Sequence, residues 1–197
     1  MKDYIFIIGP SGVGKTTLAK GLFEHYKGVY FEQNMVPEFS VPDTCEDKGA
    51  FEEETCFDNV ILQLKFFHAK GFENIIALDF NDLRIRELPI IFKGYSFVIL
   101  KLISSNPEQI KNQMIYRNNN EGGLYDIENV VNSNEKIKNR SLLPNEIVID
   151  IYEKTKEEVL SEAINKIDNY KPLLDYEYIE PDKNLFDSWV QSDGLRK

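Results

Sequence analysis

The sequence has few of the features that mark disulfide-rich, metal-binding or membrane proteins. Only two of its 197 residues are cysteines, Cys45 and Cys56, too few for a disulfide framework and without the spacing of metal ligands. No stretch approaches the roughly 20 consecutive apolar residues that span a bilayer, and the first residues lack the apolar region of a signal peptide. We therefore expect a cytoplasmic protein with no membrane partner.

Positive charge is also scarce. The chain holds 23 Lys and Arg against 33 Asp and Glu, a formal net charge of −10. A general nucleic-acid binder needs a positive surface, so we do not expect that activity. Apolar residues make up 42% of the chain and charged residues 28%, a balance that excludes collagen, coiled coil and wholesale disorder. The length fits one globular domain with a tail.

Five short apolar runs alternate with stretches of helical periodicity. The first, Tyr4 to Ile8, stops at Gly9 and is typical of a strand buried on both faces of a parallel sheet. The others are residues 29–31, 75–78, 97–100 and 147–149. Such alternation requires crossover connections between parallel strands. The pattern predicts a three-layer α/β fold, in which helices cover both faces of an open, mostly parallel five-stranded sheet.

One segment carries a phosphate-binding motif. Residues 9–16 read Gly-Pro-Ser-Gly-Val-Gly-Lys-Thr and fit G-x-x-x-x-G-K-[ST] between a predicted strand and a helical stretch. In such a loop the backbone amides surround a polyphosphate, Lys15 reaches the β- and γ-phosphates, and Thr16 supplies a hydroxyl to Mg²⁺. We therefore expect ATP and Mg²⁺ as cofactors, with the base preference left open. The residues expected to bind the nucleotide are Gly9, Ser11, Gly12, Val13, Gly14, Lys15, Thr16 and Thr17.

This loop and its setting resemble those of the P-loop NTPase superfamily, and within it the nucleoside and nucleotide kinase-like branch. The resemblance extends by layout over residues 1–167 and implies a P-loop kinase-like domain. It implies that residues 34–50 are an insertion on the acceptor side and that residues 117–125 are a lid. The loop sequence is also similar to that of guanylate kinases, but the acceptor pattern of those enzymes, rich in Thr and Arg, is missing.

The resemblance also suggests two further catalytic residues. Asp79 follows an apolar run, as the Walker B carboxylate does, which implies that it orders Mg²⁺ or accepts a proton. The alternative is that Asp79 caps the next helix. Arg117 stands where kinases of this branch have lid arginines, which implies that it stabilises the transferred phosphate, with Arg140 as a weaker companion.

The acceptor side departs from the nucleotide kinases. Residues 28–64 contain no arginine and a single lysine, Lys48, among many acidic residues. Carboxylates repel a phosphorylated acceptor, so a small hydroxyl-bearing or cationic acceptor is favoured. Glu32, directly after the second predicted strand, is the preferred general base, and Glu38 is the alternative. The sequence therefore predicts an ATP-dependent phosphotransferase that acts on a small molecule.

Two other functions stay open at this stage. A nucleoside monophosphate kinase would need cations from elsewhere, such as Arg84 or Arg86. A nucleotide-binding or ATP-hydrolysing module would transmit its state to a partner through residues 168–197, an acidic tail whose aromatic residues predict docking on the domain. The sequence also leaves open whether the chain forms a homodimer.

Overall fold

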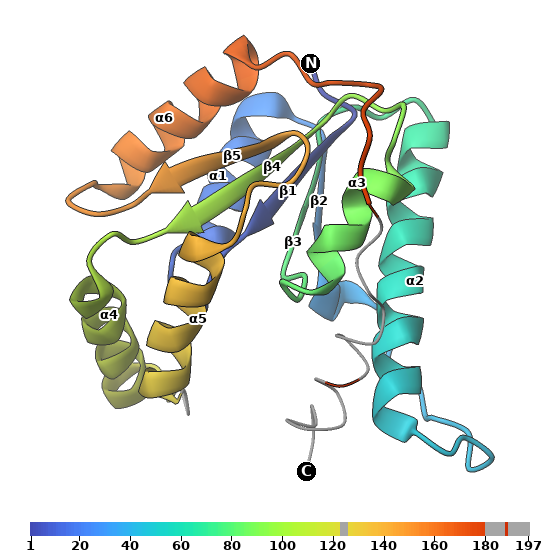
Figure 1. Ribbon diagram of the computed structural model, residues 1–197, viewed down its shortest axis with the longest axis horizontal. Coiled ribbons are helices and arrows are strands. Elements are labelled where there is room, and N and C mark those ends of the chain that lie inside the picture. The colour runs from blue at the N-terminus through green and yellow to red at the C-terminus, as the bar shows by residue number, and fades with distance from the viewer. Residues whose placement is uncertain (123–125, 180–187, 189–197) are drawn as a thin grey trace.

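The computed structural model of the chain describes residues 1–122, 126–179 and 188, and a five-stranded sheet forms its centre (Figure 1). The strands are β1 (Tyr4–Ile8), β2 (Val29–Glu32), β3 (Ile75–Leu78), β4 (Phe97–Ile103) and β5 (Glu146–Asp150). Their order is β2-β3-β1-β4-β5, and each neighbouring pair is parallel. The predicted open α/β sheet is confirmed, and its described strands are all parallel.

β1 lies in the middle of the sheet because both of its faces are apolar. All five of its residues are buried, and Tyr4 is in register with Ile75 of β3 and Phe97 of β4. Successive side chains of a strand point to opposite faces. Ile5 and Ile7 therefore belong to one apolar core, while the aromatic residues of β1 belong to the core on the other face.

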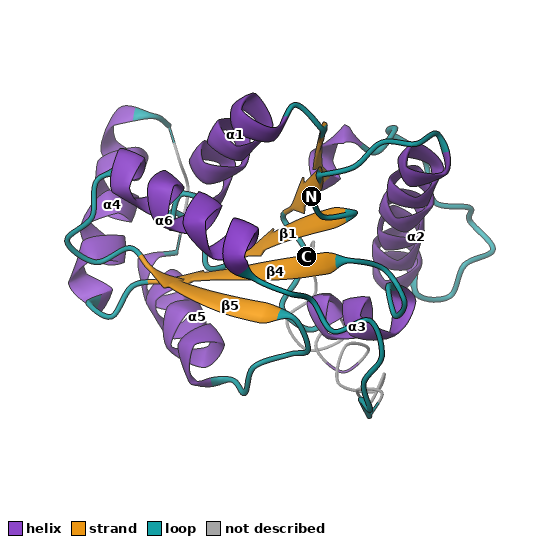
Figure 2. Cartoon of the chain, turned by 90° about the horizontal axis from the view of Figure 1, so that it is seen from above, coloured by secondary structure: helices purple, strands orange, loops and turns teal. Residues whose placement is uncertain are grey.

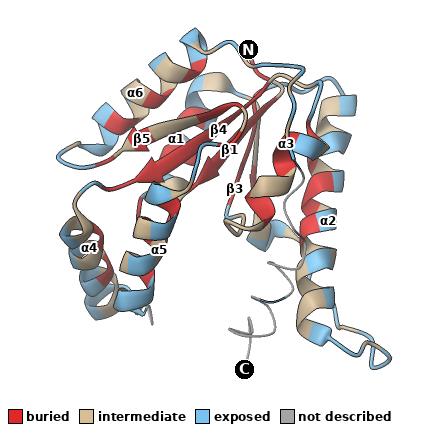
Figure 3. Cartoon of the chain, in the orientation of Figure 1, coloured by how far each residue is buried: buried red, intermediate tan, exposed pale blue. Residues whose placement is uncertain are grey.

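Helices cover both faces of the sheet. They are α1 (Lys15–Tyr26), α2 (Lys48–Ala69), α3 (Leu88–Ile91), α4 (Pro107–Asn120), α5 (Ile127–Asn139) and α6 (Lys156–Asn169), with 3₁₀ turns η1 (Gln33–Met35) and η2 (Arg84–Glu87). α1 and α6 pack on one face, and α2 and α3 on the other (Figure 2). The helices on the two faces turn buried residues toward the sheet, whereas α4 and α5 pack against each other beyond the carboxyl ends of the strands (Figure 3). None of the helices in the described part of the chain is long and apolar enough to cross a bilayer.

Side chains cap the starts of two helices, α4 and α6. The side chain of Asn106 accepts a hydrogen bond from the Glu108 amide at 3.1 Å, which caps α4. Thr155 and Glu158 form a capping box at the start of α6, where each side chain accepts a hydrogen bond from the other residue's amide. These caps satisfy amides that lack intrahelical partners and so fix where both helices begin.

The first part of the predicted tail lies against the domain. The side chain of Asn145 donates to the Leu173 carbonyl at 2.9 Å and accepts from the Leu173 amide at 2.8 Å. Farther along, the hydroxyl of Tyr178 donates to the Arg86 carbonyl at 3.0 Å. Residues 180–187 and 189–197 of the tail, and residues 123–125 of the predicted lid, lie outside the described residues.

Candidate active site

The P-loop joins the central strand β1 to helix α1. Gly14 is the N-cap of α1 with a φ of 95°, a left-handed conformation that glycine adopts without steric cost. Lys15 is the first helical residue, and the amides of a first helical turn have no intrahelical acceptor. These amides and the helix dipole make the loop a site for an anion.

Lys15 is folded over this loop. Its Nζ donates to the carbonyls of Gly9 and Pro10 at 3.1 and 3.2 Å and lies 3.8 Å from Oδ1 of Asp79. Burial lowers the pKa of the Lys15 ammonium, the charge of Asp79 opposes this effect, and the charge of Arg117 adds to it. The site therefore places a desolvated cation where a phosphate would lie.

Asp79 directly follows β3, the neighbour of β1. Its φ is 71°, in the left-handed region that residues with a Cβ rarely adopt. Such backbone strain costs about 1–3 kcal/mol and is concentrated at functional sites. The conformation carries the carboxylate toward the P-loop, and Asp79 lines the cavity that also contains Lys15.

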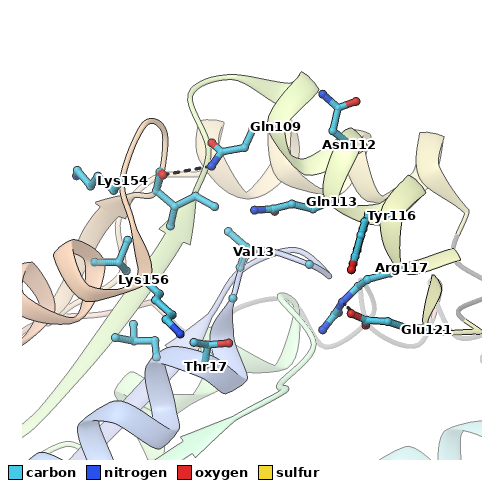
Figure 4. Close-up of a pocket in the computed structure, with 15 residues that line it drawn as sticks. Val13, Thr17, Gln109, Asn112, Gln113, Tyr116, Arg117, Glu121, Lys154 and Lys156 are labelled. Carbon is cyan, nitrogen blue, oxygen red and sulfur yellow. Dashed lines mark hydrogen bonds and ion pairs between the residues drawn. The ribbon is translucent and has the colours of Figure 1, made fainter. Parts of the chain in front are cut away.

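A first cavity, here called the α4 cavity, lies between the P-loop, helix α4 and the β5–α6 connection (Figure 4). Its volume is about 650 Å³. Gly12, Val13 and Gly14 form its P-loop side, and Lys154 and Lys156 lie on the side of the β5–α6 connection. Its apolar lining residues are Val13, Leu18, Ile151 and Val159. A cavity of this size and character suits a nucleoside.

Two further cavities lie on the Lys15 side of the P-loop. The Lys15 cavity, of about 330 Å³, is lined by Lys15, Asp79 and the residues that follow β3. The insertion cavity, of about 490 Å³, is lined by residues 36–39 and the first turns of α2. Gln33, Glu53 and Asp79 line both. The two cavities therefore border each other beside the Lys15 ammonium.

These two cavities are acidic. Their carboxylates are Glu38, Glu52, Glu53, Asp79 and Asp82. Lys15 is the one cation among the described lining residues. The sequence did not single out Glu52, Glu53 or Asp82 as lining residues. The acidic run of residues 52–54 at the start of a helix was the signal for Glu53.

The arginines that could serve a phosphorylated acceptor are engaged elsewhere. Arg84 is buried, with its guanidinium 4.0 Å from the centre of the Phe57 ring and 3.2 Å from Glu87. Arg86 pairs with Asp82 at 3.3 Å, which turns its charge toward that carboxylate. Neither arginine is among the described lining residues of the two acidic cavities.

The two candidate bases on the acceptor side occupy different places. Glu32 ends β2 and accepts a hydrogen bond from the Tyr30 hydroxyl, and it does not appear among the described residues that line the three cavities. Glu38 lines the insertion cavity together with Asp79. The structure thus brings Glu38, but not Glu32, to the same cavity as Asp79.

Arg117 lies on α4 and lines the α4 cavity, with its Nε 3.4 Å from Oε2 of Glu121. Arg140 does not accompany it. The Arg140 guanidinium is almost fully buried, where it binds both oxygens of Glu146 at 2.6 and 3.0 Å and Asp82 at 3.0 Å. The expectation that Arg140 assists in the lid is therefore wrong, because its guanidinium is buried in ion pairs with Glu146 and Asp82.

Thr16 and Asp79 are the expected ligands of Mg²⁺. Among the described residues no group of three or more His, Cys, Asp or Glu could hold a metal ion. A magnesium site formed by one hydroxyl, one carboxylate and the phosphates of a nucleotide does not need such a group. The donor set of the P-loop therefore fits Mg²⁺ bound together with a nucleotide.

Similarity to known proteins appears in structure and not in sequence. No family model and no curated protein matches the chain. One similar solved structure is a gluconokinase from Sinorhizobium meliloti 1021, with 12% identity and a TM-score of 0.57 over 97% of this chain and 98% of that one. A sugar kinase from Janibacter sp. HTCC2649 has 16% identity and a TM-score of 0.55 over 85% of this chain and 95% of that one. A shikimate kinase from Acinetobacter baumannii in complex with shikimate has 17% identity and a TM-score of 0.51 over 87% of this chain and 97% of that one. The chain therefore has the P-loop fold of the nucleoside and nucleotide kinase-like proteins.

Proposed function

We propose that the protein is an ATP-dependent phosphotransferase that moves the γ-phosphate to a hydroxyl group of a small molecule. The observation that carries the proposal is the position of Lys15, at a P-loop with the α4 cavity on one side and the two acidic cavities on the other. A nucleotide in the α4 cavity would direct its terminal phosphate across the loop toward Lys15. The similar structures include kinases named for gluconate, sugars and shikimate, which supports a small-molecule acceptor.

The P-loop, Asp79 and Arg117 would each contribute to this reaction. The amides of the P-loop and the ammonium of Lys15 neutralise the phosphates, and their fixed positions lower the cost of the charge that develops in the transfer. Thr16 would hold Mg²⁺, with Asp79 ordering the ion through water, and the ion would supply positive charge to the phosphates. Arg117, across the α4 cavity, would add positive charge to the transferred group.

The acceptor would lie in the two acidic cavities. A carboxylate there must orient the acceptor hydroxyl and take its proton. Asp79 is the proposed base, since it lines both cavities and faces Lys15. Glu38 lines one of them and is the second candidate. Glu32 is the third, since it lines neither cavity and its carboxylate accepts a hydrogen bond from Tyr30.

The charge of these cavities favours an acceptor without a phosphate. Four of the lining carboxylates, Glu38, Glu52, Glu53 and Asp79, would repel a phosphate dianion. The fifth, Asp82, is paired with Arg86 and Arg140, and Arg84 is paired with Glu87. This arrangement supports a neutral or cationic hydroxyl-bearing acceptor over a nucleoside monophosphate.

A coupled assay of ADP release tests the proposal. Purified protein with ATP and Mg²⁺ is given neutral and amine-bearing alcohols, sugars, nucleosides and nucleoside monophosphates, and Lys15→Ala serves as the inactive control. We expect a neutral or cationic alcohol to stimulate ADP release and nucleoside monophosphates to give no stimulation. Stimulation by a monophosphate alone would establish the nucleotide kinase instead. Hydrolysis that no acceptor changes would favour an ATP-hydrolysing module.

A further inference from the structure

Helix α2 lies at the edge of the molecule, and its outer side carries large apolar residues (Figure 1). The inner side, which packs on the sheet, consists of the buried residues Phe57, Val60, Ile61 and Leu64. On the outer side Leu62 is 68% exposed and Phe66 54%. The two residues are one helical turn apart, so their side chains are neighbours on the helix surface. An amphipathic helix with one apolar side for the core would have polar residues here.

The outer apolar residues form a row along the helix, here called the α2 stripe: Phe51, Thr55, Leu62, Phe66 and Ala69. Their spacings of four, seven, four and three residues place them on the same side of α2. Aromatic residues extend the stripe beyond the helix, where the Phe67 ring contacts the rings of Phe66 and exposed Phe72, each with 5.7 Å between ring centres. Adjacent exposed apolar residues of this kind are typical of a protein–protein contact.

Charge is divided between the two halves of α2. The acidic residues lie in the first half and are Glu52, Glu53, Glu54 and Asp58. Lys48, the first residue of the helix, is paired with Asp43 at 2.9 Å. The second half has Lys65, and Lys70 is the C-cap. Asp58, Lys65 and Lys70 form no ion pair with another residue in the described part of the chain. The helix therefore has an acidic half and a basic half beside one apolar stripe.

This division makes the outer side of α2 complementary to itself. Two copies of α2 that pack in opposite directions place the acidic half of each against the basic half of the other. With the two-fold axis at Leu62, Asp58 lies opposite Lys65 of the second copy, because Asp58 is four residues before Leu62 and Lys65 three residues after it. Packing in the same direction would bring like charges together, which is unfavourable. A two-fold symmetric contact requires such self-complementarity.

We propose that the protein forms a homodimer through the α2 stripe, with the two α2 helices antiparallel. Burial of Leu62 and Phe66 supplies the affinity. The charges contribute little to affinity, since exposed ion pairs are weak, but they fix the direction of packing. The stripe contains none of the described residues that line the three cavities, so the inference is independent of the proposed function.

Sedimentation velocity over a series of protein concentrations tests the inference. The wild type is compared with Leu62→Glu and with Leu142→Glu, which makes the same change at a residue that is 59% exposed between α5 and β5. We expect the wild type and Leu142→Glu to form a species of twice the 22.9 kDa of one chain. Leu62→Glu should raise the dissociation constant of the dimer at least about tenfold, because symmetry introduces the change twice and sets the two new carboxylates against each other.

Charge reversal tests the antiparallel direction with substitutions at exposed residues that carry no part of the core. Lys65→Glu should weaken the dimer, because it brings a carboxylate to Asp58 of the second copy. The double variant Asp58→Lys with Lys65→Glu exchanges the two charges and should restore the dimer. These variants also decide the question should Leu62→Glu fail to fold.

A wild type that stays monomeric at every concentration would overturn the inference and leave the stripe to a different partner. A dimer that Leu62→Glu leaves intact, or that Leu142→Glu weakens equally, would also overturn it, since the contact would then lie elsewhere. A double variant that stays as weak as Lys65→Glu would refute the antiparallel packing. None of these measurements requires a nucleotide or an acceptor, so failure of the phosphotransferase assay leaves the dimer untouched.

Discussion

The ammonium nitrogen of Lys15 lies 3.8 Å from Oδ1 of Asp79, so one ion pair joins the P-loop to the end of β3. The two residues are far apart in sequence, and the parallel pairing of β1 with β3 brings the carboxyl ends of both strands to the same edge of the sheet. Lys15 is 14% exposed and Asp79 38%. The cation is therefore shielded from water while the carboxylate remains accessible to an acceptor or to Mg²⁺.

Replacing Lys15 by methionine should lower the rate of phosphate transfer by about 10²–10³-fold, the usual loss when one preorganised charge-stabilising group is removed. The reason is that no other described cation lines the Lys15 cavity. Steady-state kinetics measures the effect. Lys20→Met, an exposed change on the same helix, is the matched control and should leave the rate unchanged. A Lys15→Met enzyme with full activity would show that Lys15 does not contact the phosphates.

The same variant should be more stable than the wild type in the absence of nucleotide. Burial lowers the pKa of Lys15 below its ordinary value of 10.5, so the charged form is disfavoured in the folded protein. Between the lowered pKa and 10.5 the unfolded chain binds more protons, and the stability of the wild type should therefore rise with pH through that window.

Thermal unfolding at neutral and alkaline pH checks this prediction. Lys15→Met should unfold at a higher temperature at pH 7, by about 2–4 °C for each kcal/mol gained, and its advantage should shrink at alkaline pH. A lower unfolding temperature at pH 7 would mean that the contacts of Lys15 with Gly9, Pro10 and Asp79 outweigh its desolvation.

Substitutions of Asp79 should separate its backbone strain from its chemistry. Asp79 has a φ of 71°, and both Asp79→Gly and Asp79→Ala remove the pair with Lys15. Asp79→Gly should therefore be more stable than Asp79→Ala by about 1–2 kcal/mol, because only glycine adopts this φ without strain. Asparagine tolerates this conformation, so Asp79→Asn changes the chemistry without adding strain. It should lower Mg²⁺-dependent turnover more than it weakens nucleotide binding. Chemical denaturation and kinetics of the three variants measure both effects. Equal stability of Asp79→Gly and Asp79→Ala would show that the strain is not present in solution.

Arg140→Met should destabilise the protein by about 3–5 kcal/mol, because it leaves a buried carboxylate without its partner. Glu146 has no exposed side-chain surface and Arg140 only 8%. The double variant Arg140→Met with Glu146→Leu should recover much of this loss, since both charges are then absent. Urea denaturation measures the free energies of unfolding. A loss below 1 kcal/mol in the single variant would show that the pair is solvated.

The fold and the P-loop could be predicted because their signals are local. A continuous apolar run such as residues 4–8 is typical of a strand buried on both faces. The spacing of Gly9, Gly14 and Lys15 is the one that a phosphate-binding loop requires. Asp79 was found for the same reason, since a carboxylate at the end of a buried strand has a defined place in a parallel sheet.

The rest of the site depends on contacts between distant segments. From the sequence, Arg140 is expected to be a surface arginine after a helix. Its partners Glu146 and Asp82 lie on a strand and a loop that the sequence alone does not place beside it. The partners of such side chains are determined by packing between distant segments.

Titration of Mg²⁺-ATP into the wild type and into Lys15→Ala tests most directly whether this loop binds a nucleoside triphosphate. The account predicts saturable binding by the wild type and a loss of at least about tenfold in affinity in the variant. Absence of binding by the folded wild type, or equal affinity of the two proteins, would contradict it.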